Sequence, residues 1–411
     1  MLMPGQLQAP PPLAVYVHLP WCVRKCPYCD FNSHAQRGEI PEQRYLAALT
    51  RDLERSLPLV WGREVSSIFI GGGTPSLFSG AGIDELLCML RTLLRVSPVA
   101  EITLEANPGT FEMARFKAFR NAGVNRLSLG IQSFNSRHLG ALGRIHDADE
   151  ARAAASAALD LFETVNLDLM YALPEQTLAE ARQDLETAIN LGPAHLSAYH
   201  LTLEPNTPFA AAPPPLPDDD AAADMQLMVE ETLADAGYRH YETSAFAKPG
   251  QECAHNLNYW TFGDYLGLGA GAHGKLSQHD RIERQARSKH PQAYMDAVLG
   301  ESETAWVDTN WAETSWAETN WNEMRWIETR TLTRSDRIFE FMMNALRLTQ
   351  GFDPRLFEAR TGLPLRLAEA ALRSAEQRGL LLRTPDNIRP SEQGRHFLNE
   401  LLQIFLPEDA A

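Results

Sequence analysis

Cys22, Cys26 and Cys29 lie within eight residues of one another, in a chain of 411 residues that contains only two other cysteines. On an α-helix this spacing would place three thiols on one face. Pro27 argues against that helix, because proline lacks a backbone N–H and clashes with the preceding turn. The alternative is a loop wrapped around a metal centre, since thiolates are soft ligands for zinc and for iron–sulfur clusters.

The number of cysteines separates these two kinds of metal centre. A structural zinc site usually has four ligands arranged as two close pairs, so zinc would need a further ligand such as His18 or His34. Three cysteines suit a [4Fe-4S] cluster better, because one iron is then left without a protein ligand and can chelate a small molecule. Arg24 and Lys25 would offset part of the negative charge of that cluster. We therefore favour the cluster.

The elements that must position this loop can be read from the alternation of β-rich and amphipathic segments. Six β-rich segments each end in a loop punctuated by Gly or Pro. They span residues 14–20, 66–75, 101–108, 125–134, 164–174 and 195–205. Six βα units in series predict an α/β fold whose parallel sheet curls into a partial or complete barrel of the TIM type.

Polar residues recur at one place in these units. Gly71 to Thr74, Glu105, Gln132, Asp168 and His200 all lie at or just beyond the predicted carboxyl ends of their strands. The cysteine loop follows the first strand, so it belongs to the same rim. Because α/β barrels and open α/β sheets build their sites at that end, we expect these residues to converge on one site.

The composition changes after residue 205, and we divide the chain into five regions. They are a disordered N-terminus (1–13), the barrel (14–205), a connector with a segment rich in Gly, His and aromatic residues (206–300), a low-complexity insertion (301–330) and a small, mainly helical C-terminal domain (331–411). The last region has the pattern of a winged helix, but the acidity of the chain favours a role as a lid or packing element over DNA binding.

The low-complexity insertion contains a tryptophan at every fifth residue, at Trp306, Trp311, Trp316, Trp321 and Trp326. A period of five fits neither a helix nor a strand, so these indoles cannot share one buried face. We expect a mobile loop, with binding of a partner as the less favoured alternative.

The overall composition limits the classes of protein to consider. Hydrophobic residues make up 44% of the chain and the net charge is -16, which is typical of an acidic globular protein and disfavours nucleic acid as a partner. The N-terminal segment lacks the basic and apolar regions of a signal peptide, and nothing approaches the roughly 18 apolar residues of a membrane span. With no pattern of a disulfide framework either, these features predict a cytoplasmic protein.

CVRKCPYC fits the CxxxCxxC signature of the radical S-adenosylmethionine (SAM) superfamily, and the GGGTP after the second strand resembles the loop of that superfamily that binds the amino group of SAM. The resemblance implies a partial (βα)6 barrel and a [4Fe-4S] cluster that cleaves SAM reductively to methionine and a 5′-deoxyadenosyl radical. It assigns Gly72, Gly73 and Thr74 to SAM binding, where glycine would allow close backbone approach to the methionine part of SAM.

Further motifs resemble the coproporphyrinogen-oxidase-like branch of that superfamily over nearly the whole chain except the tryptophan repeat. LEANP, GIQSF, LGRIH and NLDLMYALP resemble SAM-contacting segments, which implies SAM contacts for Glu105, Gln132, Arg144 and Asp168. Tyr16 precedes the cluster as in that branch, where it contacts SAM. Carboxylates and an amide can hold ribose hydroxyls or an amino group, and an arginine can pair with a carboxylate. The alternative for each is an ordinary polar residue at a strand end.

Phe31 distinguishes two groups within this branch. The oxygen-independent coproporphyrinogen III oxidases carry a fourth cysteine two residues after the third, and Phe31 stands at that position here. CxxxCxxCxF instead resembles the HemW-type proteins, proposed haem chaperones that lack the decarboxylase activity and deliver haem to haem-dependent enzymes. The anaerobic decarboxylation of coproporphyrinogen III remains an alternative, as does a radical SAM reaction on an unrelated substrate.

CAHNLNYW, residues 253–260, contains the HNxxYW feature that is associated with haem binding in the HemW group. By this resemblance His255 is an axial iron ligand, with Asn256 beside it, and Tyr259 and Trp260 flank the porphyrin plane. Cys253 is an alternative soft ligand. The alternative reading is structural, with the amide and aromatic side chains packing a domain junction and the histidine bonding locally.

The segment GLGAGAHGK, residues 267–275, follows and also resembles the family. It suggests His273 and Lys275 as partners of the haem propionates. The resemblance further implies haem-accepting proteins as partners, and membrane-bound respiratory enzymes are among the options. Through such partners the protein would associate peripherally with the membrane. The resemblance is also compatible with a homodimer. Whether SAM is cleaved in the working cycle or only regulates haem transfer stays open at this point.

Overall fold

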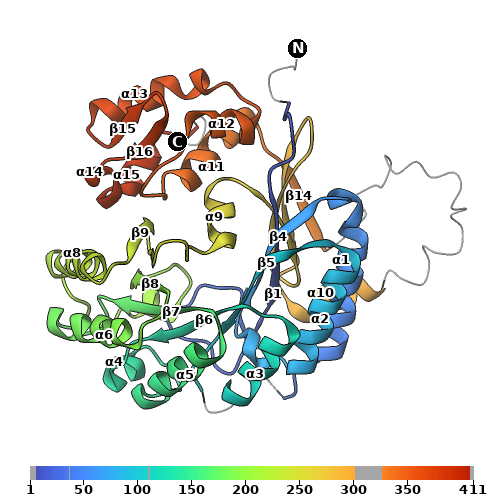
Figure 1. Ribbon diagram of the computed structural model, residues 1–411, viewed down its shortest axis with the longest axis vertical. Helices are drawn as coiled ribbons and strands as arrows, with labels where there is room; N and C mark the ends of the chain where they lie inside the picture. The colour runs from blue at the N-terminus through green and yellow to red at the C-terminus, as the bar shows by residue number, and fades with distance from the viewer. Residues whose placement is uncertain (1–5, 37, 110–111, 301–325, 408–411) are drawn as a thin grey trace, which may run out of the picture.

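The computed structural model describes residues 6–36, 38–109, 112–300 and 326–407 of the chain. Its centre is a sheet with six parallel strands that pair in chain order (Figure 1). These strands are β1 (Leu13–Leu19), β4 (Glu64–Gly72), β5 (Arg95–Ala106), β6 (Arg126–Gln132), β7 (Thr164–Tyr171) and β8 (His195–His200). The prediction of six βα units in a partial barrel is confirmed.

Helices cover the outer face of the curled sheet (Figure 1). They are α1 (Glu42–Val60), α2 (Gly80–Leu93), α3 (Glu112–Ala122), α4 (Ser136–Ala141), α5 (Ala148–Leu161) and α6 (Leu178–Leu191). Alternate strand residues, such as Val15, Val17, Leu127 and Leu129, pack between sheet and helices in the main core. Because strand side chains alternate between the two faces, the residues between them line the inside of the barrel. Gly192 caps the end of α6 with a left-handed φ of 78°.

The region 206–300 does more than connect, so the prediction of a connector is wrong for most of it. After α7 (Pro208–Ala211) and α8 (Asp219–Asp235), β9 (Arg239–Glu242) and β10 (Ala245–Ala247) extend the β8 edge of the sheet. At the other edge β11 (Asp264–Leu268) pairs in parallel with β1, followed by the antiparallel β12 (His273–Ser277), β13 (Ile282–Arg287) and β14 (Ile327–Thr331). The pairing of β11 with β1 joins segments that are far apart in the chain, and local periodicity carries no signal for it.

Two predicted boundaries are corrected by packing. Part of the N-terminal segment predicted to be disordered belongs to the fold, because Leu7 is buried in the core of the C-terminal domain and its backbone N–H donates to the carbonyl of His279 over 2.8 Å. Trp326 belongs to the fold rather than to a mobile loop, since it is 1% exposed beneath the Arg55 guanidinium and leads into β14. The other four tryptophans of the repeat lie outside the described residues.

The C-terminal domain has its own apolar core and is mainly helical, as predicted. Three helices precede a two-stranded hairpin and two short helices, which is the arrangement that the winged-helix prediction anticipates. The elements are α11 (Arg334–Ala345), α12 (Pro354–Thr361), a 3-10 turn (Leu365–Ala368), α13 (Glu369–Gln377), β15 (Leu381–Thr384), β16 (Asn387–Pro390), α14 (Glu392–His396) and α15 (Leu398–Gln403).

Two further short helices pack against the barrel sheet or its helices. α10 (Pro291–Gly300) packs on α1, and α9 (Ala254–Trp260) lies between the C-terminal domain and the sheet (Figure 1). In the part of the chain that the structure describes, no helix has both the length and the apolarity to cross a bilayer.

Candidate functional site

The cysteine loop is an irregular segment between the short parallel strands β2 (Trp21–Cys22) and β3 (His34–Ala35), as expected from Pro27. All three thiols are half-buried and free. Burial raises the pKa of the Cys22 thiol, and the nearby thiols of Cys29 and Cys26 raise it further. Three thiols that interact with one another on a partly open rim fit the ligand set of an iron–sulfur cluster.

One of the two candidate further ligands for zinc, His18, is engaged elsewhere. Both ring nitrogens of His18 are engaged, with the Tyr16 hydroxyl at 2.9 Å and the Asn32 carbonyl at 2.8 Å, so this residue is not free to complete a zinc site.

The GGGTP loop packs against the base of the cysteine loop. Gly73 and Thr74 donate their backbone N–H groups to the carbonyls of Leu19 and Trp21, over 2.9 and 2.7 Å. A Cβ on Gly73 would lie 2.5 Å from the Trp21 oxygen, and Gly72 has a φ of 125°. The glycines are therefore needed already for contact between the two loops, a reason that sequence reasoning missed when it considered only the approach of SAM.

A chain of hydrogen bonds joins the rim segments to the cysteines. The Thr74 hydroxyl donates to Cys22 Sγ over 3.5 Å and accepts from Asn107 Nδ2 over 2.9 Å. Arg144 Nη2 donates to Asn107 Oδ1 over 2.6 Å, while its Nη1 lies 3.9 Å from Cys26 Sγ. Asn107 was not predicted as a site residue, although it lies within the LEANP motif. Its amide connects two predicted SAM residues and two predicted cluster ligands.

Two carboxylates lie inside the barrel beside this series of hydrogen bonds. Burial and, to a lesser extent, the neighbouring Asp168 raise the pKa of Glu105 to about 8. Glu105 Oε2 accepts from the Gly72 N–H over 3.2 Å, which ties it to the GGGTP loop. Asp168 accepts from Asn166 and Ser128 over 2.8 and 3.1 Å, and burial also raises its pKa. A half-buried acidic pair of this kind is suited to a cationic ligand.

Tyr16 and Gln132 complete the predicted SAM set. The Tyr16 ring is half-buried and stacks on Phe69 of β4, with ring centres 6.3 Å apart. Gln132 ends β6 with a φ of 68°, which is uncommon for a residue other than glycine and often found at functional sites. Tyr16, Gly72, Gly73, Thr74, Glu105, Gln132, Arg144 and Asp168 thus all lie at the carboxyl rim or inside the barrel. His200 also lies at this rim, stacked on Tyr171 at 5.5 Å.

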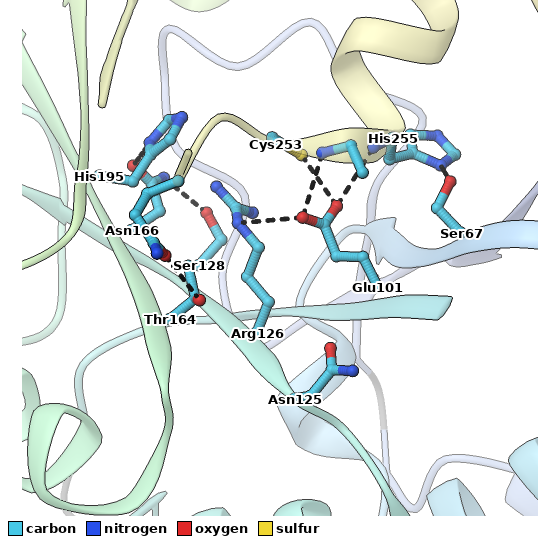
Figure 2. A network of polar contacts seen from close by, with 12 residues as sticks. Ser67, Glu101, Asn125, Arg126, Ser128, Thr164, Asn166, His195, Cys253 and His255 are labelled. Carbon is cyan, nitrogen blue, oxygen red and sulfur yellow. Dashed lines mark hydrogen bonds and ion pairs between the residues drawn. The ribbon is translucent and has the colours of Figure 1, made fainter. Parts of the chain in front are cut away.

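The HNxxYW segment forms α9 and lies at the other end of the barrel, near the start of the strands. His255 is 8% exposed, and its Nδ1 lies 3.3 Å from the Ser67 hydroxyl (Figure 2). Its ring packs on Phe69. Burial and, to a lesser extent, the charge of Arg126 lower the pKa of His255 to about 3. The imidazole is therefore neutral. Cys253 is fully buried, and its thiol donates to Glu101 over 3.4 Å.

The aromatic residues of α9 make structural contacts with the surrounding elements. Tyr259 packs on Tyr265 of β11 at 5.1 Å, and the guanidinium of Arg347 lies 4.4 Å from the ring centre of Trp260. Asn256 is half-buried. Sequence reasoning did not anticipate that this segment and the cysteine loop lie at opposite ends of the barrel, because no local pattern encodes the position of α9.

Lys275 is not available to a propionate, so that interpretation is wrong. It is 1% exposed and donates from Nζ to Asp264 Oδ1 over 2.7 Å, where it compensates a buried carboxylate of β11. His273 is exposed at the start of β12.

Comparison with known proteins agrees with this geometry. Residues 16–188 match the model of the radical SAM superfamily, and residues 332–397 match the HemN C-terminal domain. The coproporphyrinogen III oxidase HemN of Escherichia coli, a radical SAM enzyme, has a similar structure, with a TM-score of 0.78 and 25% identity over 96% of this chain and 90% of that chain.

Two curated relatives are named heme chaperone HemW. The protein of Escherichia coli K12 is 47% identical over 97% of this chain and 99% of its own length. That of Haemophilus influenzae is 46% identical over the same shares. Because these similarities span nearly the whole of both chains, the protein belongs to the HemW family within the radical SAM superfamily.

Proposed function

We propose that the protein is a haem chaperone that binds a [4Fe-4S] cluster, SAM and haem, and that it delivers haem to haem-dependent proteins of respiration. The observation that carries the proposal is Phe31. Its side chain is 61% exposed on the cysteine loop, at the position where the related oxidases have a further cysteine. Near full-length similarity to proteins named as haem chaperones supports the same conclusion.

In this proposal the thiols of Cys22, Cys26 and Cys29 hold the cluster, which supplies one open iron and an electron when it is bound. Arg144, close to Cys26, pairs with a carboxylate of SAM. Glu105 and Asp168 hold cationic and hydroxyl groups of the same ligand. The remaining SAM contacts that we propose are Tyr16, Gly72, Gly73, Thr74 and Gln132.

We further propose that His255 is the axial ligand of haem, with Asn256, Tyr259 and Trp260 shaping its surroundings. A neutral imidazole is the form that binds iron, and the depressed pKa of His255 keeps it in that form. Since His255 is 8% exposed and packs on Phe69, haem would reach it from inside the barrel or after α9 moves.

A second candidate function is the oxygen-independent oxidation of coproporphyrinogen III to protoporphyrinogen IX. It is favoured by the structural likeness to the oxidase, which covers 96% of this chain. Phe31 disfavours it, because the further thiol of the oxidases is absent.

One anaerobic experiment separates the two functions. The reconstituted full chain is titrated with haem and, in parallel, incubated with coproporphyrinogen III, SAM and a reductant. We expect a Soret band that is lost in His255→Ala and kept in the control His396→Ala, which removes an exposed histidine of α14. Formation of protoporphyrinogen IX, or the absence of haem binding, would contradict the chaperone function.

A transfer assay tests delivery. Haem-loaded protein is mixed with an apo form of a respiratory haem protein, either in solution or in vesicles. We expect the Soret spectrum of the acceptor to appear faster than with free haem at the same concentration. Equal rates would argue against delivery.

A further inference from the structure

Arg126 is a buried cation that the proposed sites do not use. It is the first residue of β6, lies on the inner face of the barrel and is 3% exposed. Its nearest acidic partner is Glu101, with 3.9 Å between Arg126 Nε and Glu101 Oε2. Within the described ranges its guanidinium makes no hydrogen bond, and Nε is buried without a partner. Figure 2 shows the guanidinium beside Glu101, near the Cys253 end of α9.

Glu101 is already occupied by other donors. Its carboxylate accepts from Cys253 Sγ over 3.4 Å and from the backbone N–H groups of Ala254 and His255, each over 3.1 Å. Glu101 thus caps the start of α9. At 3.9 Å this carboxylate forms an ion pair with Arg126 but no hydrogen bond, and Asp168 acts on the cation only electrostatically.

The other polar groups nearby are bonded to one another. Asn166 donates to Ser128 over 2.8 Å, and its Oδ1 lies 2.6 Å from His195 Nδ1. His195 Nε2 in turn lies 2.8 Å from the Tyr241 hydroxyl. No member of this network accepts a hydrogen bond from the five N–H donors of the Arg126 guanidinium.

A buried charge without hydrogen bonds is costly, and buried polar groups in folded proteins are nearly always satisfied. An arginine kept in this state is suited to a ligand that supplies two acceptor oxygens in one plane. A carboxylate does so through two parallel N–H···O bonds.

The surroundings of Arg126 indicate which carboxylate would fit. Tyr16 and Phe69 form an aromatic wall with the His255 ring, and both retain exposed surface inside the barrel. Glu105 and Asp168 lie toward the rim end of the barrel, so the acidic edge of a ligand is best placed near Arg126. A flat apolar ligand with an acidic edge matches this arrangement of an aromatic wall and a buried cation.

We propose that Arg126 binds a carboxylate of a ligand inside the barrel, and that this carboxylate is a haem propionate. The inference rests on the proposed function, because haem is the ligand considered. Haem fits better than SAM, because the carboxylate of SAM already has a proposed partner in a different arginine, Arg144, which lies beside Cys26 of the cysteine loop.

The test compares haem with its dimethyl ester, in which both propionates are neutral, by Soret titration of the cluster-loaded full chain. Wild-type protein should bind haem roughly ten- to hundredfold more tightly than the ester, as expected for a buried charge-assisted hydrogen bond. Arg126→Gln should bind both equally, and Arg126→Lys should keep part of the preference. The control Arg95→Gln, which alters a 70% exposed side chain at the start of β5, should behave as wild type.

Each outcome bears on a separate statement. Equal binding of haem and ester by the wild-type chain would overturn the propionate site while leaving haem binding intact. A preference that survives in Arg126→Gln would overturn the role of Arg126. A loss of SAM affinity in that variant, with haem preference unchanged, would assign the carboxylate to SAM and overturn the proposal. Absence of haem binding by the wild-type chain would remove the proposed function itself.

Discussion

Protonation of Glu105 should make SAM binding depend on pH in the neutral range. Burial and the adjacent Asp168 raise its pKa to about 8 in the unliganded protein. The sulfonium and ammonium groups of SAM are cationic, so the ligand favours the ionised carboxylate. With this pKa, the ionised fraction is about 1% at pH 6, about 10% at pH 7 and about half at pH 8.

These fractions set the expected size of the effect. The apparent dissociation constant is inversely proportional to the competent fraction, so it should fall about tenfold between pH 6 and 7 and about fivefold between pH 7 and 8. Above pH 9 it should change little. Glu105→Gln should remove this dependence and weaken binding at pH 9 by at least about tenfold, because a charged partner is lost.

Equilibrium dialysis of labelled SAM against the reconstituted protein measures both curves. Titration of the ligand itself is common to the two proteins, so the ratio of their dissociation constants isolates Glu105. A ratio that stays constant from pH 6 to 9 would refute the reasoning, either because Glu105 does not contact SAM or because it is ionised throughout.

The same proton should affect folding with a definite sign. The folded pKa of Glu105 lies above its ordinary value of 4.5, so the folded state binds the proton more tightly than the unfolded state. This contribution to stability is fully present below about pH 4.5 and is lost as the pH rises through about 8. The unliganded wild-type protein should therefore lose more thermal stability than Glu105→Gln between pH 7 and 9.

Three further substitutions test the supports of the site. Gly73→Ala places a Cβ 2.5 Å from a backbone oxygen of the cysteine loop, so the iron content after reconstitution should fall severalfold. The control Gly140→Ala adds its Cβ in open space and should keep the iron content of the wild type. Glu101→Leu removes the cap of α9 and should speed the exchange of backbone amide hydrogens in residues 254–260 about thirtyfold, which is equivalent to about 2 kcal/mol. Unchanged exchange rates would mean that α9 is held by packing alone. Lys275→Met leaves its carboxylate partner in β11 less compensated and should lower the free energy of unfolding in urea by about 3 kcal/mol. The exposed control Lys117→Met should change that free energy by less than about 0.5 kcal/mol.

The local features of this protein could be predicted from sequence because their causes are local. Alternating apolar residues in each strand, such as Leu127 and Leu129, report the outer face of the sheet, and Pro27 reports that the cysteine segment is a loop. The rim residues Glu105 and Asp168 follow from strand ends alone, since parallel strands bring their carboxyl ends to one edge. For the same reason the three cysteines could be assigned to that rim.

Other features exist only in the folded chain. The pairing of β11 with β1, the burial of Trp326 and the ion pair of Lys275 with Asp264 each join segments whose partners no local pattern specifies. The position of α9 at the far end of the barrel is of the same kind, and it alone brings His255 close to Arg126. By itself the sequence determined the strands, the cysteine loop and the carboxyl rim. The tertiary structure decided what closes the other end of the barrel, because burial and charge compensation there depend on side chains that meet only when the sheet curls.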